Sequence, residues 1–305
     1  MSRLQPVPAY LASAVNLHLV SDVHCQEDSW ARARIGKVLD DADRMVGRHT
    51  IDAHLVMGDL TNTALPAEAS LWAAWRDGLA SGGAQRPVHA VLGNHDLNQL
   101  TPDQAAALLG LPAANYIQDV GDVRLIALAL TVLPIGNSAR MVVPPEALAF
   151  LDAQLGATTR PCLVLFHAPL AETVGVGDLA TSFTSEEDWV KAHSDPAGGD
   201  GVLRQILAAH PNAVAWISGH THSPISTPGL VTTVDLGSHL IAAVNASGLW
   251  YTGRSIEAHD PLCGLLLSVL DEHTFEVRFR DHGAGVWTAP TGAENAGRKV
   301  VTLTV

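Results

Sequence analysis

Residues 16–24 read Asn-Leu-His-Leu-Val-Ser-Asp-Val-His, an apolar run that ends directly in two potential metal ligands. The run at 16–21 has the length and composition of a buried β-strand. Asp22 and His24 follow it two positions apart, and if the strand continued, its pleat would place both side chains on one side. A carboxylate and an imidazole in this position could chelate one metal ion.

The same arrangement, an apolar strand followed by a short polar turn, recurs further along the chain. These polar turns are Gly58-Asp59, Gly93-Asn94-His95-Asp96, Phe166-His167 and Gly219-His220-Thr221-His222. In open α/β sheets, ligands bind at the carboxyl ends of strands, so turns that are far apart in sequence can meet there. The glycine that opens three of the turns permits unusual backbone angles. We therefore expect these polar side chains to converge.

The chain from residue 16 to residue 217 alternates apolar runs with helix-like segments. Strands are expected at 16–21, 53–57, 88–92, 123–130, 162–166 and 213–217. Helices are expected at 29–46, 67–79, 102–109, 145–155 and 202–210. Strands that alternate with helices predict sheets covered by helices, an α/β or closely related layered fold.

The pattern changes near residue 231, where further strands are expected at 231–235, 239–244, 265–270 and 274–280. Residues 271–273 have the character of a short hairpin connection. We interpret 231–305 as a β-rich tail that completes a second sheet, so that residues 1–305 form a single domain. The glycine-rich and proline-rich stretch at 171–201 is expected to be an insert at the rim of the active site, because loops of this length are usually functional.

Composition limits the class of protein and of partner. With 305 residues, 47% of them hydrophobic and 16% charged, the chain has the composition of a folded globular protein. Its net charge of −13 argues against a broad basic surface, so we expect no stable nucleic-acid partner. A small anionic substrate remains compatible, because bound divalent cations can dominate the field inside one cleft.

The cysteines and the apolar stretches restrict the cellular setting. Cys25, Cys162 and Cys263 are odd in number and lack CxxC spacing, which argues against a disulfide framework. The longest apolar stretch, 125–135, is too short to span a bilayer, and we expect no membrane association. The first fifteen residues faintly resemble a secretory signal that prolines interrupt. A cytoplasmic location is expected, with secretion and oligomeric state left open.

Each polar residue also has an ordinary structural interpretation. A single histidine in an apolar context such as His167 is often a core residue, Asp59 could cap a helix, and Asn94 could belong to a turn. Adjacent imidazoles are harder to explain as turn residues. The ordered set, with each member after a strand, indicates a metal site. Imidazole and carboxylate ligands without thiolates suit zinc, iron, manganese or nickel.

Taken in order, Asp-x-His, Gly-Asp, Gly-Asn-His-Asp, His and Gly-His-x-His resemble the calcineurin-like metallophosphoesterase superfamily, over residues 22–222. The resemblance implies a four-layer α/β/β/α sandwich of two mixed sheets flanked by helices. It also implies two divalent or mixed-valence transition metal ions, drawn from manganese, iron and zinc. The implied ligands are Asp22, His24, Asp59 and His222 for one ion, and Asp59, Asn94, His167 and His220 for the other, with Asp59 bridging.

The implied activity is hydrolysis of small phosphodiesters, cyclic nucleotides among them, by in-line attack of a metal-bridging hydroxide. Two divalent ions, two aspartates and one hydroxide leave the cluster with a net charge of about +1, which would attract a phosphodiester anion. By resemblance, His95 protonates the leaving oxygen or steadies the phosphoryl group. Asp96 either orients His95 or has a structural part. Asn94, His95 and His239, which lies in a Gly-Ser-His turn similar to one near the substrate of relatives, are candidate substrate contacts.

The motif set is most similar to that of class III cyclic nucleotide phosphodiesterases. Purple acid phosphatases carry a tyrosine three residues after the bridging aspartate, where this chain has Asn62. Ser/Thr protein phosphatases show Gly-Asp-x-x-Asp-Arg-Gly, which residues 58–64 do not match. Three alternatives stay open. They are a nuclease, which would need a basic groove, a phosphomonoesterase, and a non-catalytic scaffold, which would be expected to have lost ligands.

Overall fold

The computed structural model describes most of the chain. The described residues are 14–27, 29–46, 51–81, 86–98, 100–135, 138–170, 173, 201–222, 229–246, 248–249, 262–288 and 300–305. The predicted rim insert at 171–201 lies outside them, apart from Thr173 and Gly201.

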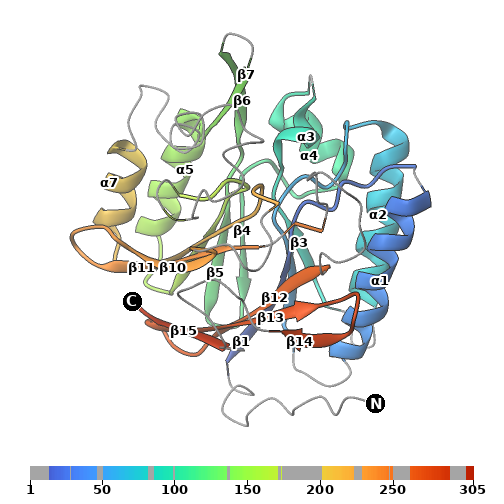
Figure 1. Cartoon of the computed structure of the whole chain (residues 1–305). Coiled ribbons are helices and arrows are strands. Elements are labelled where there is room, and N and C mark those ends of the chain that lie inside the picture. The colour runs from blue at the N-terminus through green and yellow to red at the C-terminus, as the bar shows by residue number, and fades with distance from the viewer. Residues whose placement is uncertain are drawn as a thin grey trace.

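Two mixed β-sheets form the centre of the molecule (Figure 1). The strands of the larger sheet are β1 (Val15–Val20), β2 (Ala53–Val56), β3 (Val88–Ala90), β12 (Cys263–Val269), β13 (Thr274–Asp281), β14 (Val286–Thr288) and β15 (Val300–Thr304). Their order is β14-β13-β12-β1-β2-β3, and β15 also pairs with β13. β1, β2 and β3 run parallel, whereas β12 pairs antiparallel with β1. The first three polar turns therefore follow the carboxyl ends of three adjacent parallel strands, on the same side of the sheet.

The second sheet carries the other two polar turns. Its strands are β4 (Tyr116–Val120), β5 (Val123–Ala127), β8 (Cys162–Leu165), β9 (Ala213–Ser218), β10 (Val231–Asp235) and β11 (Leu240–Asn245). Their order is β10-β11-β9-β8-β5-β4. The central strands β5, β8, β9 and β11 are parallel, and the two edge strands are antiparallel. A separate hairpin is formed by β6 (Thr131–Ile135) and β7 (Ser138–Val142).

Helices cover the outer faces of both sheets (Figure 1). The helices are α1 (Ser29–Val46), α2 (Pro66–Ser81), α3 (Asn94–Leu97), α4 (Pro102–Leu109), α5 (Pro145–Gly156) and α7 (Gly201–Ala209). α1 and α2 lie together beside the larger sheet, and α5 and α7 lie together beside the other. The layered α/β fold predicted from the strand and helix pattern, and the four-layer α/β/β/α arrangement that the family resemblance implies, are therefore confirmed.

The alternation of side chains along the strands builds these layers. In β1, Leu17 and Leu19 belong to the apolar cluster between the two sheets, and Val20 joins the cluster beneath the helices. In β8, Leu163 faces the other sheet and Val164 faces the helices. Because both faces are covered, these strands are largely apolar, with Asn16 and His18 as buried polar exceptions in β1, and this is why the sequence shows them so clearly. The core thereby holds the strand ends, and the polar turns on them, in fixed positions.

The β-rich tail requires a correction. We expected 231–305 to complete one sheet, but β10 and β11 extend the second sheet, whereas β12 to β15 extend the larger one. The hairpin at 271–273 joins β12 and β13 as expected. β4, β6, β7, β14 and β15 were not predicted. Most of these are edge or hairpin strands, and β4 is exposed at its centre, so they lack the continuous apolar pattern of buried strands.

The cysteines and the helices of the described residues can be examined directly. Cys25, Cys162 and Cys263 are all buried and unbridged. Within the described part of the chain, no helix combines the length and the apolar character needed to cross a membrane.

A buried polar network fastens α1 to the larger sheet. Asp41 of α1 forms a bidentate ion pair with Arg280 at 2.7 and 2.6 Å, and it accepts a hydrogen bond from Nδ1 of His282 at 2.9 Å. Nε2 of His282 lies 3.1 Å from Nε2 of His18, and Nδ1 of His18 lies 2.8 Å from Nδ1 of His54. All five side chains are at most 3% exposed. No sequence motif singles out these three histidines.

The network has one consistent set of tautomers. Burial lowers the pKa of His54 to about 4, and it lowers the pKa of His18 and His282 as well, so all three rings are neutral near pH 7. Since the Asp41 carboxylate accepts the first hydrogen bond, His282 and His18 each donate toward Asp41 and accept from the next ring, and His54 donates to His18 at the end of the chain. Gly264 makes room for this chain, because a Cβ there would lie 2.3 Å from Nε2 of His282.

We expect the network to make the fold sensitive to acid. Between the ordinary histidine pKa of about 6.5 and the lowered folded values, the unfolded chain binds protons that the folded chain excludes. The free energy of unfolding therefore falls as pH falls through this window. Each such ring contributes a slope of about 1.4 kcal/mol per pH unit. Urea unfolding of metal-free protein between pH 6.5 and pH 4.5 should show a shallower slope in His54→Leu than in the unaltered protein.

The exposed His273 provides a matched control, since His273→Gln removes a histidine from the surface. Its slope should equal that of the unaltered protein. Equal slopes for His54→Leu and the unaltered protein would contradict the expectation.

Candidate metal centre

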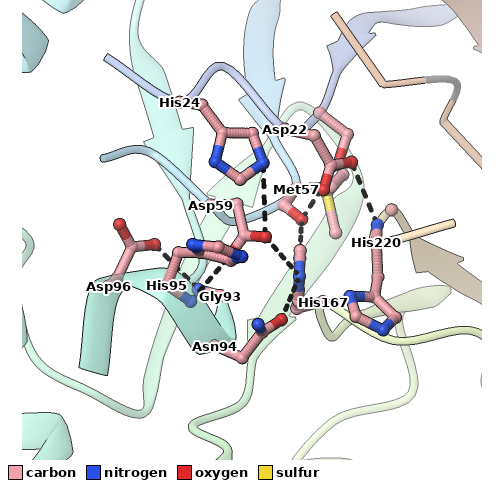
Figure 2. A network of polar contacts seen from close by, with 12 residues as sticks. Asp22, His24, Met57, Asp59, Gly93, Asn94, His95, Asp96, His167 and His220 are labelled. Atoms are coloured by element: carbon pink, nitrogen blue, oxygen red, sulfur yellow. Dashed lines mark hydrogen bonds and ion pairs between the residues drawn. The ribbon is translucent and has the colours of Figure 1, made fainter. Parts of the chain in front are cut away.

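The five polar turns meet where the carboxyl ends of β1, β2 and β3 face those of β8 and β9 (Figure 2). Backbone hydrogen bonds tie the turns together. The amide of Asp22 donates to the carbonyl of Gly58 at 3.1 Å, and the amide of His24 donates to the carbonyl of Asp59 at 2.9 Å. The amide of Gly219 donates to the carbonyl of His167 at 2.7 Å. The predicted convergence is therefore present in the structure.

The backbone of the turns is strained. Asp22, His24, Asp59, His220 and His222 have φ angles of 54°, 45°, 49°, 69° and 47°. L-residues other than glycine rarely adopt this left-handed region, and such residues cluster at functional sites. β1 ends at Val20 and β9 at Ser218, so neither strand continues through its turn and a shared pleat does not position these side chains. The left-handed backbone places Asp22 and His24 in one group of potential ligands, whereas His220 and His222 fall in different groups.

Glycines allow the turns to approach closely. A Cβ on Gly93 would lie 2.1 Å from Oδ1 of Asp59, and a Cβ on Gly219 would lie 1.7 Å from Oγ of Ser21. A Cβ on Gly58 would lie 2.3 Å from Nδ1 of His167. Each distance is shorter than any real contact of a Cβ atom, so these positions exclude side chains. The sequence indicated glycines that permit unusual backbone angles, and of the three only Gly58 has a positive φ, of 90°. At all three positions the structure shows that close approach requires a glycine.

One group of potential ligands consists of Asp22, His24, Asp59 and His222, whose ligand atoms all lie within 4.8 Å of one another. Nε2 of His24 lies 3.3 Å from Nε2 of His222 and 3.6 Å from Oδ2 of Asp59. Oδ1 of Asp22 lies 3.0 Å from Nε2 of His222. Ligands about 2.1 Å from a metal in tetrahedral geometry are separated by roughly 3.4 Å. The group therefore has the dimensions of a transition-metal site.

The second group consists of Asp59, His167 and His220, again with ligand atoms within 4.8 Å of one another. Oδ2 of Asp59 lies 3.4 Å from Nε2 of His167, and Oδ1 of Asn94 lies 3.2 Å from the same nitrogen. The carbonyl of Met57 accepts a hydrogen bond of 2.6 Å from Nδ1 of His167, which turns Nε2 toward the cluster (Figure 2). The same Asp59 oxygen thus approaches both groups.

Burial and charge set the protonation of the cluster. Burial lowers the pKa of His24 to about 4 and that of His220 to about 3, so both rings are neutral, the form that binds metals. Burial alone would raise the pKa of Asp59, but the neighbouring His167 outweighs it and holds that pKa well below its usual range. Burial opposes protonation of His167, yet Asp59 raises its pKa to about 9. A cation would replace this proton.

His95 lies at the rim of the cluster, with an exposed side chain. Its amide donates to Oδ1 of Asp59 at 2.9 Å, and its Nδ1 lies 2.8 Å from the carbonyl oxygen of Asn62. Since a carbonyl only accepts, Nδ1 carries the hydrogen and Nε2 remains available. The ring packs edge to face against His24, with centroids 4.7 Å apart. The exposed ring of His95 therefore lies directly beside the first group of potential ligands.

For Asp96 the sequence left two interpretations open, that it orients His95 or that it has a structural part. Its carboxylate is completely buried and accepts hydrogen bonds from the amides of Gly93 at 2.8 Å, Leu60 at 3.1 Å and Thr61 at 2.8 Å. The hydroxyl of Thr61 donates a fourth, at 2.8 Å. Burial, followed by the charge of Asp59, raises its pKa to about 6. Asp96 therefore joins two backbone turns, and the structural alternative describes it better than a catalytic one.

His239 does not contact the cluster. Its Nε2 lies 3.3 Å from the carbonyl oxygen of Ala213, at the first residue of β9, and its Nδ1 lies 3.0 Å from Oγ of Ser238. The ligand turn follows Ser218 at the other end of the same strand. Six residues of strand span about 20 Å. The Gly-Ser-His turn therefore lies near the amino end of β9, at the opposite end of the strand from the polar turn. The substrate contact expected for His239 is incompatible with this position.

Some supporting residues were not found from the sequence. Asn245, at the end of β11, donates to the carbonyl of Gly219 at 2.7 Å and accepts from the Thr221 hydroxyl at 2.7 Å, which holds the last ligand turn. The carbonyls of Met57 and Asn62 orient His167 and His95. Every residue has a backbone carbonyl, so the sequence does not show which carbonyls orient a side chain. A polar residue at the end of an apolar strand was the available signal for Asn245.

Comparison with known structures supports the fold. The purple acid phosphatase PPD1 from yellow lupin (Lupinus luteus) seeds is similar with a TM-score of 0.58 and 14% identity, over 96% of this chain and 54% of the lupin chain. This chain thus spans about half the length of that phosphatase. GAP50, the anchor in the inner membrane complex of Plasmodium, is similar with a TM-score of 0.53 and 10% identity, over 96% of this chain and 89% of that chain.

The sequence itself decides the family. No curated protein sequence matches the chain significantly. The sequence model of the calcineurin-like phosphoesterases matches residues 15–224, which include both groups of potential ligands and His95. By this match and by its four-layer fold, the chain belongs to the calcineurin-like phosphoesterase family.

Proposed function

We propose that this protein hydrolyses small phosphodiesters, cyclic nucleotides among the candidates, with two transition metal ions drawn from manganese, iron and zinc. Asp22, His24, Asp59 and His222 would hold one ion. Asp59, Asn94, His167 and His220 would hold the other. The observation that carries the proposal is the position of Oδ2 of Asp59, which lies 3.6 Å from Nε2 of His24 and 3.4 Å from Nε2 of His167.

The composition of the site supports metal binding by the chain. Carboxylate and imidazole donors, without a nearby thiolate, suit these transition metals. The residues with left-handed backbone angles are strained, and strained residues of this kind cluster at functional sites. Two cations bound here would supply Lewis-acid activation of the ester and would acidify a water molecule toward neutral pH.

Within the proposed reaction, His95 is the proton donor to the leaving oxygen. The hydrogen bond from Nδ1 to the Asn62 carbonyl fixes the ring, so the second proton of an imidazolium resides on Nε2. The amide of His95 is anchored to Oδ1 of Asp59, which ties the donor to the bridging carboxylate. Asn94 immediately precedes His95, and its side-chain amide lies at the same cluster of potential ligands. We propose that it contacts the phosphoryl group.

Charge favours a diester as the substrate. The five turns contain no lysine or arginine, so cations would provide the main positive charge within them. Two divalent ions with Asp22, Asp59 and a hydroxide leave about one positive charge. A phosphodiester carries one negative charge and matches it, whereas a monoester dianion would need a further cationic group. The lupin phosphatase shares the fold, but a shared fold does not establish which class of phosphoester this chain prefers.

A scaffold without chemistry is the main non-enzymatic alternative, because GAP50, an anchor by name, shares the fold. The retained ligand set argues for an enzyme here. A nuclease would need a basic surface, which the net charge of −13 disfavours. A phosphomonoesterase is distinguished by the first test below.

The substrate class is tested with protein reconstituted with Mn²⁺, Fe²⁺ or Zn²⁺. The panel comprises an aryl phosphodiester, an aryl phosphomonoester, cyclic nucleotides and single-stranded DNA. We expect kcat/KM to be highest for a small diester. Faster turnover of the monoester would replace the diester proposal, and no turnover of any ester with each metal would favour the scaffold.

The shared carboxylate is tested by metal binding. Asp59→Asn should abolish loading of both ions, as followed by calorimetric titration with Mn²⁺. Gly93→Ala places a Cβ 2.1 Å from Oδ1 of Asp59 and should weaken binding by about 10-fold to 100-fold. Gly36→Ala is the matched control, since a Cβ there meets nothing within 4 Å. If Asp59→Asn still bound two ions with normal affinity, the bridging role would be refuted.

The role of His95 is tested by separating binding from turnover. His95→Ala should leave the Mn²⁺ stoichiometry unchanged, because the ring belongs to neither ligand group. Its kcat should fall by about 10² to 10⁴, the usual contribution of a general acid. A turnover rate equal to that of the unaltered protein would remove His95 from the mechanism.

A further inference from the structure

A short segment between Asp59 and α2 is held from both sides at Thr63. On one side, Glu68 accepts hydrogen bonds from the Thr63 amide at 2.7 Å and from the Thr63 hydroxyl at 3.0 Å. On the other side, Nδ2 of Asn98 donates to the Thr63 carbonyl at 2.8 Å. Every polar group of Thr63 therefore has a partner outside the segment.

The residue before Thr63 is the one that orients the proposed proton donor. The carbonyl of Asn62 accepts the hydrogen of Nδ1 of His95, at 2.8 Å. Asn62 and Thr63 share a peptide bond, so a carboxylate and an amide that fix Thr63 also limit where that carbonyl can point. Glu68 is only 5% exposed, which shields its hydrogen bonds from competition by water.

A purely structural interpretation of Glu68 is available, because it is the third residue of α2 and also approaches the amide of Leu65 at 3.4 Å. Acidic residues at this position commonly cap helices. α4 has the same device, in which Gln104 accepts from the Thr101 amide at 2.9 Å. Gln104 has no link to Asn62 or His95 in its hydrogen bonds. Gln104 is thus a helix cap without a link to His95, whereas Glu68 is a helix cap that also binds Thr63, next to Asn62. The two residues can therefore be compared.

We propose that Glu68 and Asn98 are positioning residues, which hold Thr63 so that the Asn62 carbonyl keeps Nε2 of His95 directed at the leaving oxygen. This inference rests on the proposed function and assigns two further residues to it. Neither residue touches a potential metal ligand in its hydrogen bonds. Their effect should therefore appear in proton donation and leave metal binding unchanged.

The experiment compares two aryl diesters that differ only in the leaving group, 4-nitrophenolate and phenolate. The good leaving group departs without a proton, whereas phenolate needs one. Glu68→Ala and Asn98→Ala should lower kcat for the phenyl ester about tenfold more than for the nitrophenyl ester. Glu68→Gln should restore most of this loss, because its amide oxygen can accept from both backbone amides and its nitrogen can donate to the Thr63 hydroxyl. Gln104→Ala is the matched control and should affect both esters equally.

A second measurement does not depend on turnover. In metal-free protein labelled with ¹⁵N-histidine, the Nδ1–H signal of His95 should be visible in the unaltered protein and in Gln104→Ala. It should broaden or disappear in Glu68→Ala and in Asn98→Ala, because the accepting carbonyl is no longer fixed. Asn98 is exposed, so its variant tests the inference even where Glu68→Ala does not fold.

The outcomes separate this inference from the function beneath it. If the unaltered protein cleaves no diester, the proposed function itself fails. If it cleaves both esters and His95→Ala shows the leaving-group dependence, the function stands. Equal losses for the two esters in Asn98→Ala and Glu68→Ala, with an intact Nδ1–H signal, would then overturn the positioning role.

Discussion

One carboxylate oxygen, Oδ2 of Asp59, approaches the donor atoms of both ligand groups, and the remainder of the site is arranged around it. A carboxylate that is 1% exposed would ordinarily be costly, because ions are poorly solvated inside a protein. In the absence of metal, the surrounding imidazoles offset the cost of burying the Asp59 carboxylate. Bound cations would offset it more strongly. The other oxygen is also engaged, by the amide of His95, so the group has no freedom to turn. The proposed ligand geometry and the proposed proton donation would consequently depend on the same side chain.

Rigidity around that oxygen comes from strain that the sandwich supports. Several ligand-bearing residues have left-handed backbone angles, which cost on the order of 1–3 kcal/mol each. The buried strands on either side supply the compensating stability, and Asp96 contributes by joining the turns that carry Asp59 and Asn94. Close contacts at Gly58, Gly93 and Gly219 complete the arrangement. Packing thus positions the ligands before any cation is bound, and pre-organised donors are what a metal site needs.

The sequence predicted the layered fold and the residues that meet, because both depend on local patterns. Buried strands are apolar on both faces, and the polar turn after each one stands out. Local patterns did not determine the outcome where position depended on the whole fold. The tail divides between two sheets because β12 pairs with β1, a partner that composition does not identify. Asp96 turns toward backbone amides, and His239 lies at the opposite strand end. The hydrogen-bonded core histidines were likewise invisible, since their partners come from distant elements.

Those core histidines also restrict how the strands can align. His18 and His54 are directly opposite one another in the parallel pairing of β1 with β2. A slip of one residue would turn one ring into the apolar layer between the sheets, where it would find no polar partner. The network therefore discriminates against misaligned pairings more strongly than exchangeable leucines or valines could. Because Asp22 and Asp59 lie a few residues beyond these strands, correct alignment there is also what places the two aspartates within reach of each other.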